Sequence, residues 1–171
     1  MDRAYGALRA VILRVGVLVF GMLMLNILVS IAARYLNLPI TNIDWVEETS
    51  RFLFIWLSFL GAALAVEQSA HIRIDFFARL LPARARMVLE ILVYLGMVTF
   101  AALMTYEGAL INMRAGDRSP VLLIPMSYAY LALPVGGAAI VFFAFRKLVS
   151  LIIRWVQGEG YVDAPGQVEV E

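Results

Sequence analysis

The sequence has no cysteine and a single histidine, His71, among its 171 residues. The absence of cysteine excludes a disulfide framework, thiol redox chemistry and a cysteine-ligated metal. A b-type haem between helices takes two histidine ligands, and zinc sites take several histidine or cysteine ligands, so one histidine disfavours both groups. No set of nucleophile, base and orienting residue is visible. We therefore expect no cofactor, no metal and no catalytic residue, and we interpret the chain as something other than an enzyme.

Charge is also scarce in this sequence. Asp, Glu, Lys and Arg together make up 16% of the chain, whereas hydrophobic residues make up 63%. Soluble domains carry about 25% charged and about 45–50% apolar residues. The mean hydropathy of +0.85 points in the same direction. This composition predicts an integral membrane protein that is surrounded by membrane lipids.

Four long stretches without charge are the candidates for membrane spans. A spanning helix needs about 20 mostly apolar residues, and each stretch reaches that length with its flanking turns. The first stretch is longer than the roughly 7–15 residues of a signal-peptide core, so we expect it to be retained. The sequence thus predicts an all-α fold of four transmembrane helices in one domain, 1–157, followed by a flexible cytoplasmic tail, 158–171. The expected spans are residues 11–34, 45–68, 86–112 and 121–148.

The placement of the positive charges predicts the orientation of these spans. Of the 14 lysines and arginines, ten lie in the N-terminal segment, in the loop between the second and third spans, or after the uncharged part of the fourth span. Loops on the cytoplasmic side are enriched in Lys and Arg. We therefore expect both termini and the second loop in the cytoplasm, and the first and third loops on the opposite side.

The second loop, HIRIDFFARLLPARAR (71–86), has two interpretations that the sequence leaves open. As a helix it groups Phe76 and Phe77 on one face and basic residues away from them, which is typical of an amphipathic helix lying in the membrane interface. The alternative is a basic cytoplasmic loop without a fixed fold. His71, beside Arg73 and Asp75, is interpreted as a cap or loop anchor and not as a catalyst.

The start of the second span, WVEETSRFLFIW (45–56), carries three charges in otherwise apolar surroundings. Asp44 suits the N-cap position, and Glu47 three residues later completes a capping-box pattern. Trp45 suits the membrane interface. We expect these three residues to start the helix and to fix its depth in the membrane.

Several residues of the second span exceed what helix initiation requires. Helix capping needs only one carboxylate, and an exposed ion pair contributes only about 0–1 kcal/mol. Helix initiation therefore does not explain Glu48 and Arg51. Trp56 lies about 16 Å deeper than Trp45, far from the interface that tryptophan prefers. Small residues follow at spacings that permit close helix approach. The candidates for a partner interface are Glu48, Arg51, Trp56, Ser58, Gly61 and Ala62. A contact inside the bundle, with Gly136–Ala139, is the alternative, and the periodicity does not decide between them.

Two glutamates, Glu90 and Glu107, bracket the uncharged part of the third span. Ionisable groups within a span are candidates for ion or proton transport, but neither glutamate lies at the middle of the span. Their spacing from Arg86 and Arg114 favours structural pairing. A role in ion coupling stays open.

A resemblance to a known family covers most of the chain, from the first span to the fourth. Its core is WVEETSRFLFIWLSFLGAALAVEQSAHIRID (45–75), which resembles the signature of the small membrane subunit of tripartite ATP-independent periplasmic (TRAP) transporters. That pattern has an aromatic residue, paired acids, an arginine, an aromatic-rich apolar run, a Gly-Ala-Ala segment and a His-Ile-x-x-Asp close. Thr49 departs from it. The residues of the cytoplasmic loop motif are His71, Arg73, Asp75 and Arg79.

The resemblance implies a multi-pass protein of a bacterial or archaeal inner membrane. It implies pairing with a large membrane subunit that holds the substrate and sodium sites, and whose elevator-type scaffold the small subunit extends. A periplasmic binding protein would deliver an organic acid, such as a C4-dicarboxylate or a sialic acid. We expect no substrate-binding residue in this chain and no nucleic-acid partner. The alternative is a self-sufficient four-helix transporter that acts as a dimer, although the uncharged stretch 15–33 lacks the carboxylate that such a design requires.

Overall fold

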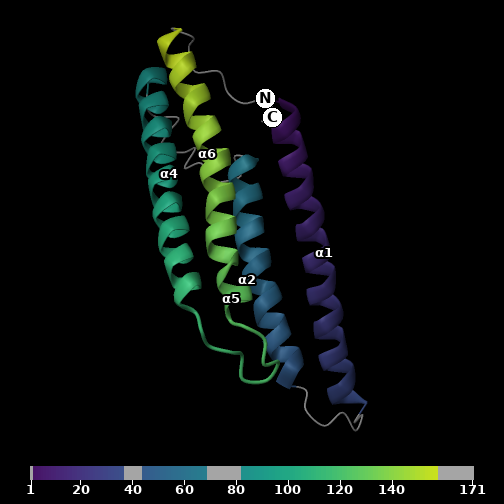
Figure 1. Cartoon of the computed structure of the whole chain (residues 1–171). Helices are drawn as coiled ribbons and strands as arrows, with labels where there is room; N and C mark the ends of the chain where they lie inside the picture. The colour runs from purple at the N-terminus through teal and green to yellow at the C-terminus, as the bar shows by residue number, and fades with distance from the viewer. Residues whose placement is uncertain (1, 37–43, 69–81, 158–171) are drawn as a thin grey trace, which may run out of the picture.

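The computed structural model describes residues 2–36, 44–68 and 82–157. Four long helices run along a common axis (Figure 1), and each is long and apolar enough to cross a membrane. The expected all-α fold with four spans is therefore confirmed. The helices are α1 (Asp2–Tyr35), α2 (Asp44–Glu67), α4 (Ala83–Arg114) and α6 (Ala132–Val156), with a short helix α5 (Ser127–Tyr130) before α6. The expected interfacial helix, with His71, Arg73, Asp75 and Arg79, and the tail over 158–171 lie outside the described residues.

α1 begins well before its expected span, α4 exceeds its expected span by a few residues at each end, and α6 continues past the expected end of the fourth span. α1 has 34 residues and α4 has 32. At 1.5 Å per residue, each is longer than the hydrocarbon core of a bilayer, which is roughly 30 Å thick. Each of these two helices is therefore long enough to continue past the hydrocarbon core at one end or at both.

The start of the fourth span is the largest departure from the expected bounds. Residues 121–126, which were expected to be helical, form an irregular loop, with Arg118 and Pro125 in an isolated antiparallel bridge. Pro125 precedes α5 and bends no helix. Pro134 is the third residue of α6, and in a first helical turn the backbone N–H that proline lacks has no intrahelical partner to lose. Neither proline therefore interrupts the hydrogen bonding of a helix interior.

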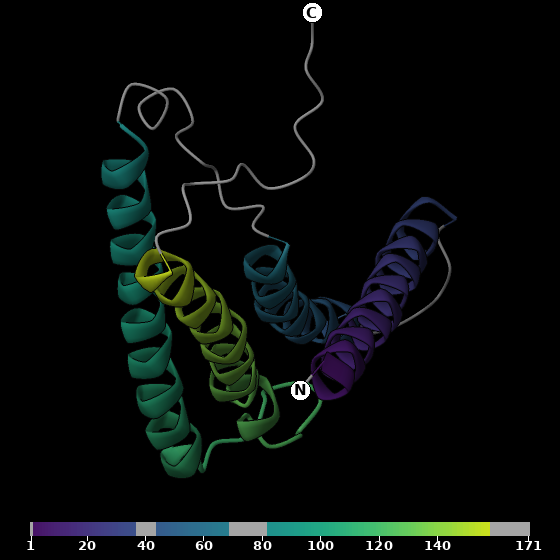
Figure 2. The ribbon, with the colours of Figure 1, turned by 90° about the horizontal axis from the view of Figure 1, so that it is seen from above.

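The helices pair in a row, and one hydrophobic core cluster draws side chains from α1, α2, α4 and α6. The principal pairs are α4 with α6, α6 with α2, and α2 with α1. Viewed along the helices, the order across the bundle is α4, α6, α2, α1 (Figure 2). α1 and α4 thus form the two edges, and α2 lies between two neighbours.

The two edge helices bury side chains with a seven-residue period. Buried and half-buried residues recur in both at alternating spacings of three and four, which is typical of helices that wind around one another with a left-handed twist. Most large hydrophobic side chains on the other faces of α1 are exposed, and in a membrane they contact lipid. The seam of α1 includes Ile12, Gly16, Val19, Leu23, Asn26, Ser30 and Ala33, and that of α4 includes Met87, Tyr94, Ala101 and Gly108.

Glycines of α6 allow the helices to approach closely. A Cβ added at Gly136 would collide with Phe59 of α2, and one added at Gly137 would collide with Thr105 of α4. The small residues of the fourth span therefore make contacts inside the bundle. Their partner on α2 is Phe59; a Cβ added at Gly61 would meet open space.

Candidate functional site

Glu48 is buried, with 8% of its surface exposed. Its Oε2 accepts hydrogen bonds from the backbone N–H groups of Val121, at 3.2 Å, and Leu122, at 2.8 Å. Successive N–H groups that point at one anion form a nest, a backbone arrangement that binds negative charge. The carboxylate therefore ties the loop before α5 to the first turns of α2.

The loop that Glu48 holds is closed by backbone hydrogen bonds. The N–H of Ser119 donates to the carbonyl of Ile124 at 2.9 Å, and that of Met126 donates to the carbonyl of Asp117 at 3.0 Å. Leu123 has a φ of 54°, a left-handed conformation that costs a residue with a side chain roughly 1–2 kcal/mol. Such a conformation persists only where its surroundings over-determine it. The loop bonds and the Glu48 carboxylate supply that constraint.

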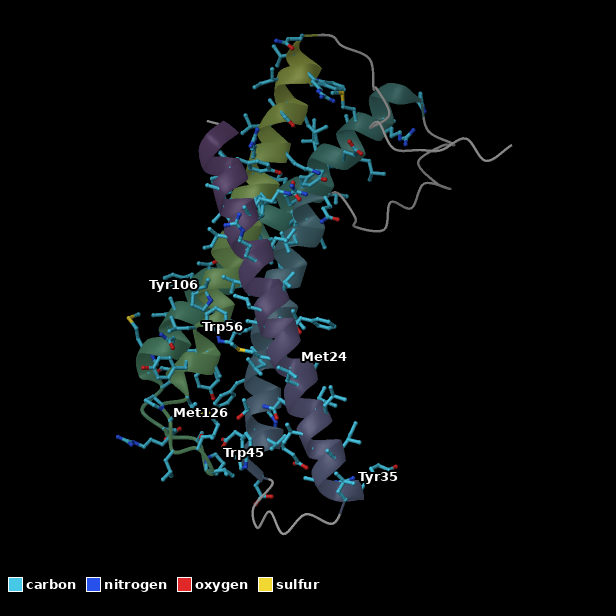
Figure 3. All side chains as sticks on the ribbon, turned by 90° about the vertical axis from the view of Figure 1, so that its right-hand side faces the viewer. Met24, Tyr35, Trp45, Trp56, Tyr106 and Met126 are labelled. Atoms are coloured by element: carbon cyan, nitrogen blue, oxygen red, sulfur yellow. The ribbon has the colours of Figure 1, made fainter. Side chains whose placement is uncertain are left out.

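Trp56 also makes a contact within the bundle. Its Nε1 donates a hydrogen bond to the carbonyl oxygen of Tyr128 at 2.9 Å. Figure 3 shows Trp56 part-way along α2, well separated from Trp45, and on the side of the bundle that carries Met126. A polar N–H at this depth requires a partner, because a bilayer core contains no water to supply one. The carbonyl in α5 explains why this tryptophan lies away from the interface.

The other interface candidates on α2 lie on a different side of the helix. Arg51, Ser58 and Gly61 are exposed, and Ala62 is half-buried. Trp56 lies roughly opposite Ser58, because two residues correspond to about 200° of rotation at 3.6 residues per turn. Exposed residues at alternating spacings of four and three share one face of a helix. We call this face the α2 stripe; its residues are Glu47, Arg51, Phe54, Ser58 and Gly61.

The charges in the first turns of α2 do not form the ion pairs that their spacing permits. Within the part of the chain that the structure describes, neither Glu47 nor Glu48 lies within ion-pair distance of Arg51. Asp44 is the first residue of α2 that the structure describes, and its role as N-cap stays a prediction. Asp44 and Glu47 both lie in the first turn, where negative charge complements the helix dipole. Trp45 is 41% exposed at this end, and its role in setting the depth of the helix stays a prediction.

A polar cluster at the opposite end of α2 was missed by reasoning from the sequence. The hydroxyl of Tyr5 donates to Glu67 Oε1 at 2.7 Å, and Arg9 Nε donates to Glu67 Oε2 at 3.1 Å. The guanidinium carbon of Arg146 lies 3.9 Å from the centroid of the Tyr5 ring. We call these four residues the Tyr5 cluster. It joins α1, α2 and α6, and its only signal in the sequence was a glutamate at the end of an apolar span.

The described residues offer no metal site, since no group of three or more His, Cys, Asp and Glu among them could hold an ion. Glu107 and Arg114 are both exposed, and they form no ion pair in this part of the structure. The polar groups of Glu48 and Trp56, on α2, make contacts within the bundle. One carboxylate holds backbone N–H groups, one indole holds a carbonyl, and one stripe of a central helix stays uncovered.

A comparison with protein families matches residues 22–154 to the family described as tripartite ATP-independent periplasmic transporters, DctQ component. The match covers well over half of the chain. The chain belongs to this family. It is therefore a small membrane subunit of a TRAP transporter, a multi-pass membrane protein and not an enzyme.

This small TRAP subunit is similar in sequence to three transporter proteins. It is 31% identical to the sialic acid TRAP transporter small permease protein of Vibrio cholerae, over 63% of each chain. It is 32% identical to the C4-dicarboxylate TRAP transporter small permease protein of Rhodobacter capsulatus, over 63% of this chain and 49% of that one. It is 36% identical to the isethionate TRAP transporter permease protein of Oleidesulfovibrio alaskensis, over 53% of this chain and only 15% of that protein. The chain thus matches only part of each of these relatives.

One polar site of the small TRAP subunit lies wholly inside the region matched to the family, and the other lies only partly inside it. Residues 22–154 include Glu48, the loop that it holds and the whole α2 stripe. They also include Glu67 and Arg146, whereas Tyr5 and Arg9 precede the matched region. The Glu48 contact therefore lies entirely within the part that defines the family, and the Tyr5 cluster does not.

Proposed function

We propose that this chain is the accessory subunit of a secondary uptake system for an organic acid, and that it pairs with a large permease subunit in a bacterial or archaeal inner membrane. The names of its relatives support this proposal, because they include carriers of sialic acid and of C4-dicarboxylates. The relative that carries isethionate contains a similar segment as a small part of a much longer permease. A relative in which a segment similar to this chain is part of a longer permease supports the pairing of this chain with a separate large permease.

We propose that the large subunit binds the substrate and moves it by an elevator mechanism driven by a sodium gradient, while this chain extends the stationary scaffold. The arrangement of the helices supports a scaffold role. They pair in a row with α1 and α4 at the edges. A row of tilted helices provides long lateral surfaces against which a larger membrane protein can pack.

We propose that both termini face the cytoplasm, in agreement with the distribution of Lys and Arg. The loop held by Glu48 then faces the periplasm, the side from which a periplasmic binding protein would deliver the substrate. Glu48 and Trp56 fix this side of the subunit from within the bundle. In this proposal they act on assembly through the loop and α5, and not by direct contact with the partner.

The observation that carries the pairing proposal is the α2 stripe. Gly61 has open space where a Cβ would lie. The hydroxyl of Ser58 donates a hydrogen bond to the carbonyl oxygen of Phe54 in its own helix, at 2.8 Å. Small residues on a membrane helix allow a neighbouring helix to approach closely, and van der Waals packing then favours association. Arg51, exposed at the loop end of the stripe, is placed to meet a polar group of the partner. We propose this stripe, with the half-buried Ala62 beside it, as the surface for the large subunit.

The test is co-expression of the tagged chain with the large permease from the same operon. The wild type should purify with that protein, and Gly61→Leu should reduce its recovery about tenfold or more because a leucine fills the space that the partner helix requires. The matched control is Gly96→Leu, a change at another helical glycine with open space around it. Arg51→Ala should reduce recovery by a smaller factor.

Two results would contradict parts of the proposal. Retention of the partner by Gly61→Leu, at the level of the control, would remove the stripe from the interface but keep the pairing. Purification of the wild type without any larger membrane protein, together with substrate flux in proteoliposomes that contain this chain alone, would support a self-sufficient transporter instead.

A further inference from the structure

The loop between α4 and α5 directs apolar side chains outward. Val121 is 42% exposed and Leu123 is 62% exposed, whereas Leu122 and Ile124 are half-buried. We call Val121 and Leu123 the loop tip. Figure 1 shows this loop, drawn in green, passing close to the lower end of α2. The tip belongs to no helix, so its exposure does not follow from the lipid-facing side of a membrane span.

Leu123 holds a backbone conformation that its side chain disfavours. Its φ is 54°, in the left-handed region that residues other than glycine, asparagine and aspartate rarely occupy. Its N–H donates to the carbonyl of Ser119 at 3.2 Å, and its carbonyl accepts a hydrogen bond from Arg118 Nη1 at 3.4 Å. Glycine would make the same backbone bonds without the steric cost. The backbone alone therefore does not account for a leucine at this position.

The fixed conformation of the loop suits a protein partner better than lipid. Strained residues cluster at functional sites, where the surrounding structure holds them in place. This loop is held by its own backbone bonds and by the Glu48 carboxylate. Fluid acyl chains accommodate an apolar side chain in many orientations, whereas a packed protein surface accepts one. A loop that is fixed in advance loses less conformational entropy when it binds such a surface.

The loop tip borders the charged end of the α2 stripe. Glu48, which accepts hydrogen bonds from the loop, lies three residues before Arg51 of the stripe. Residues three apart are neighbours on a helix surface, so a protein that covers this end of the stripe also reaches the tip. The guanidinium of Arg118 lies beside Leu123 and is exposed. Among the described residues, neither Arg51 nor Arg118 forms an ion pair, so a complementary surface is apolar with an acidic rim.

We propose that the loop tip docks into an apolar depression of the large permease subunit, with Leu123 as the anchor and Arg118 facing an acidic side chain at the rim. This inference rests on the proposed pairing with a large permease, and it adds a second contact surface to the α2 stripe. Glu48 holds the anchor in place from within the bundle and does not touch the partner. Apolar anchors that fill a pocket carry much of the binding energy of an interface.

The first experiment measures recovery of the large permease with tagged variants of this chain, and the unfolding midpoint of each variant purified alone. Leu123→Asn and Leu123→Gly should each lower the recovery about fivefold or more, because both remove the anchor. Neither should lower the midpoint, since asparagine and glycine occupy the left-handed region more readily than leucine. A role confined to the fold would instead make recovery and midpoint fall together.

Three further variants serve as controls. Met113→Asn changes a side chain that is 74% exposed at the same end of the bundle, in the last turn of α4. It should alter recovery by less than about twofold, because surface changes outside an interface have small effects. Leu123→Met keeps an apolar anchor and should retain most of the recovery. Arg118→Glu should lower recovery, and Arg118→Lys, which keeps the charge, should not.

The second experiment identifies what covers the loop tip. The chain has no cysteine, so a Val121→Cys reporter beside the anchor can be labelled selectively on this chain with a maleimide. Its labelling rate should fall about tenfold when the large permease is present, because the reaction requires access to the thiol. The rate is measured for the chain alone in detergent, for the chain alone in phosphatidylglycerol–phosphatidylcholine nanodiscs, and for the complex before and after addition of the periplasmic binding protein.

Each part of the proposal has a result that would overturn it. Unchanged recovery with Leu123→Asn, or a loss equal to that of Met113→Asn, would remove the anchor from the interface. Equal recovery with Arg118→Glu and Arg118→Lys would remove the acidic rim. Protection of the reporter in nanodiscs without the large permease would mean that lipid covers the tip, and protection only with the binding protein would assign the tip to that protein. Failure of the proposed pairing is distinct, because the wild type would then purify without any larger membrane protein.

Discussion

The two sides of α2 differ in what their polar residues contact. On one side, Glu48 and Trp56 hold the backbone of the loop and of α5 through hydrogen bonds of 2.8–3.2 Å. On the other side, Arg51 and Ser58 are exposed, and Gly61 has open space beside it. Both sides carry charge and fall within one stretch of sequence. The residue type therefore does not reveal whether a side chain serves the fold or a partner.

This comparison separates two kinds of interface that the same helix makes. The bonded side shapes the subunit itself, because removal of an acceptor there leaves buried N–H groups without partners. The stripe contributes little to the isolated subunit, because its side chains already contact solvent or lipid. Substitutions on the first side should lower stability, and substitutions on the second should lower assembly. The following predictions test that division, from the largest expected effect to the smallest.

Gly136→Val should have the largest effect on the isolated subunit. The added side chain would collide with Phe59, and overpacking of this kind costs about 1–3 kcal/mol. Thermal unfolding in detergent should show a lowered midpoint. Gly61→Val is the matched control. It should leave the free energy of unfolding within about 0.5 kcal/mol of the wild type, because valine and glycine differ little in helix propensity and the space is open. A similar loss in both variants would show that α2 does not have one packed and one open side.

Glu48→Ala should come next. Loss of the carboxylate leaves the N–H groups of Val121 and Leu122 without an acceptor, at a cost of about 2 kcal/mol. The loop should then open. Because the chain has no cysteine, a Leu122→Cys reporter can be labelled selectively, and its rate of reaction with maleimide should rise about tenfold in the Glu48→Ala background.

The neighbouring residue provides the control for this prediction. Glu47→Ala removes the same charge from the exposed stripe and should leave the labelling rate unchanged. Glu48→Gln keeps an oxygen acceptor and should fall between Ala and the wild type. An unchanged rate in Glu48→Ala would show that the loop keeps its conformation through its own backbone bonds.

Trp56→Phe should have the smallest effect. It removes one hydrogen bond, to the carbonyl of Tyr128, and retains most of the apolar surface, so the expected loss is about 1 kcal/mol. The unfolding midpoint again provides the measurement. Trp155→Phe, at an exposed tryptophan near the end of α6, is the control. If the two variants lose equal stability, the indole hydrogen bond contributes nothing measurable.

The helices themselves followed from the sequence, but their ends and contacts did not follow equally well. Composition and uncharged runs identified four spans, because backbone groups in a membrane must bond within a helix. The loop over 121–126 was expected to be helical, since its residues are apolar. A left-handed Leu123 and a carboxylate from a distant helix produce its irregular form, and neither leaves a pattern in local sequence.

The interface candidates show the same limit. Reasoning from the sequence identified Glu48, Arg51 and Trp56 as surplus to helix initiation. It assigned all three to a possible partner, because periodicity places residues on a helix without revealing what lies opposite. The structure supplies intramolecular partners for two of them and leaves Arg51 exposed.

The sequence by itself determined that this chain is a four-span helical membrane protein, because apolar length and scarce charge decide which segments partition into lipid. Its signature residues also indicated the family. Only the tertiary structure decided which side of α2 is used internally and which glycine is packed against a neighbour. It alone brought Tyr5 and Arg9 to Glu67 and Arg146. Contacts between residues far apart in the chain depend on how helices pair, and in this protein they pair in a row that no local pattern encodes.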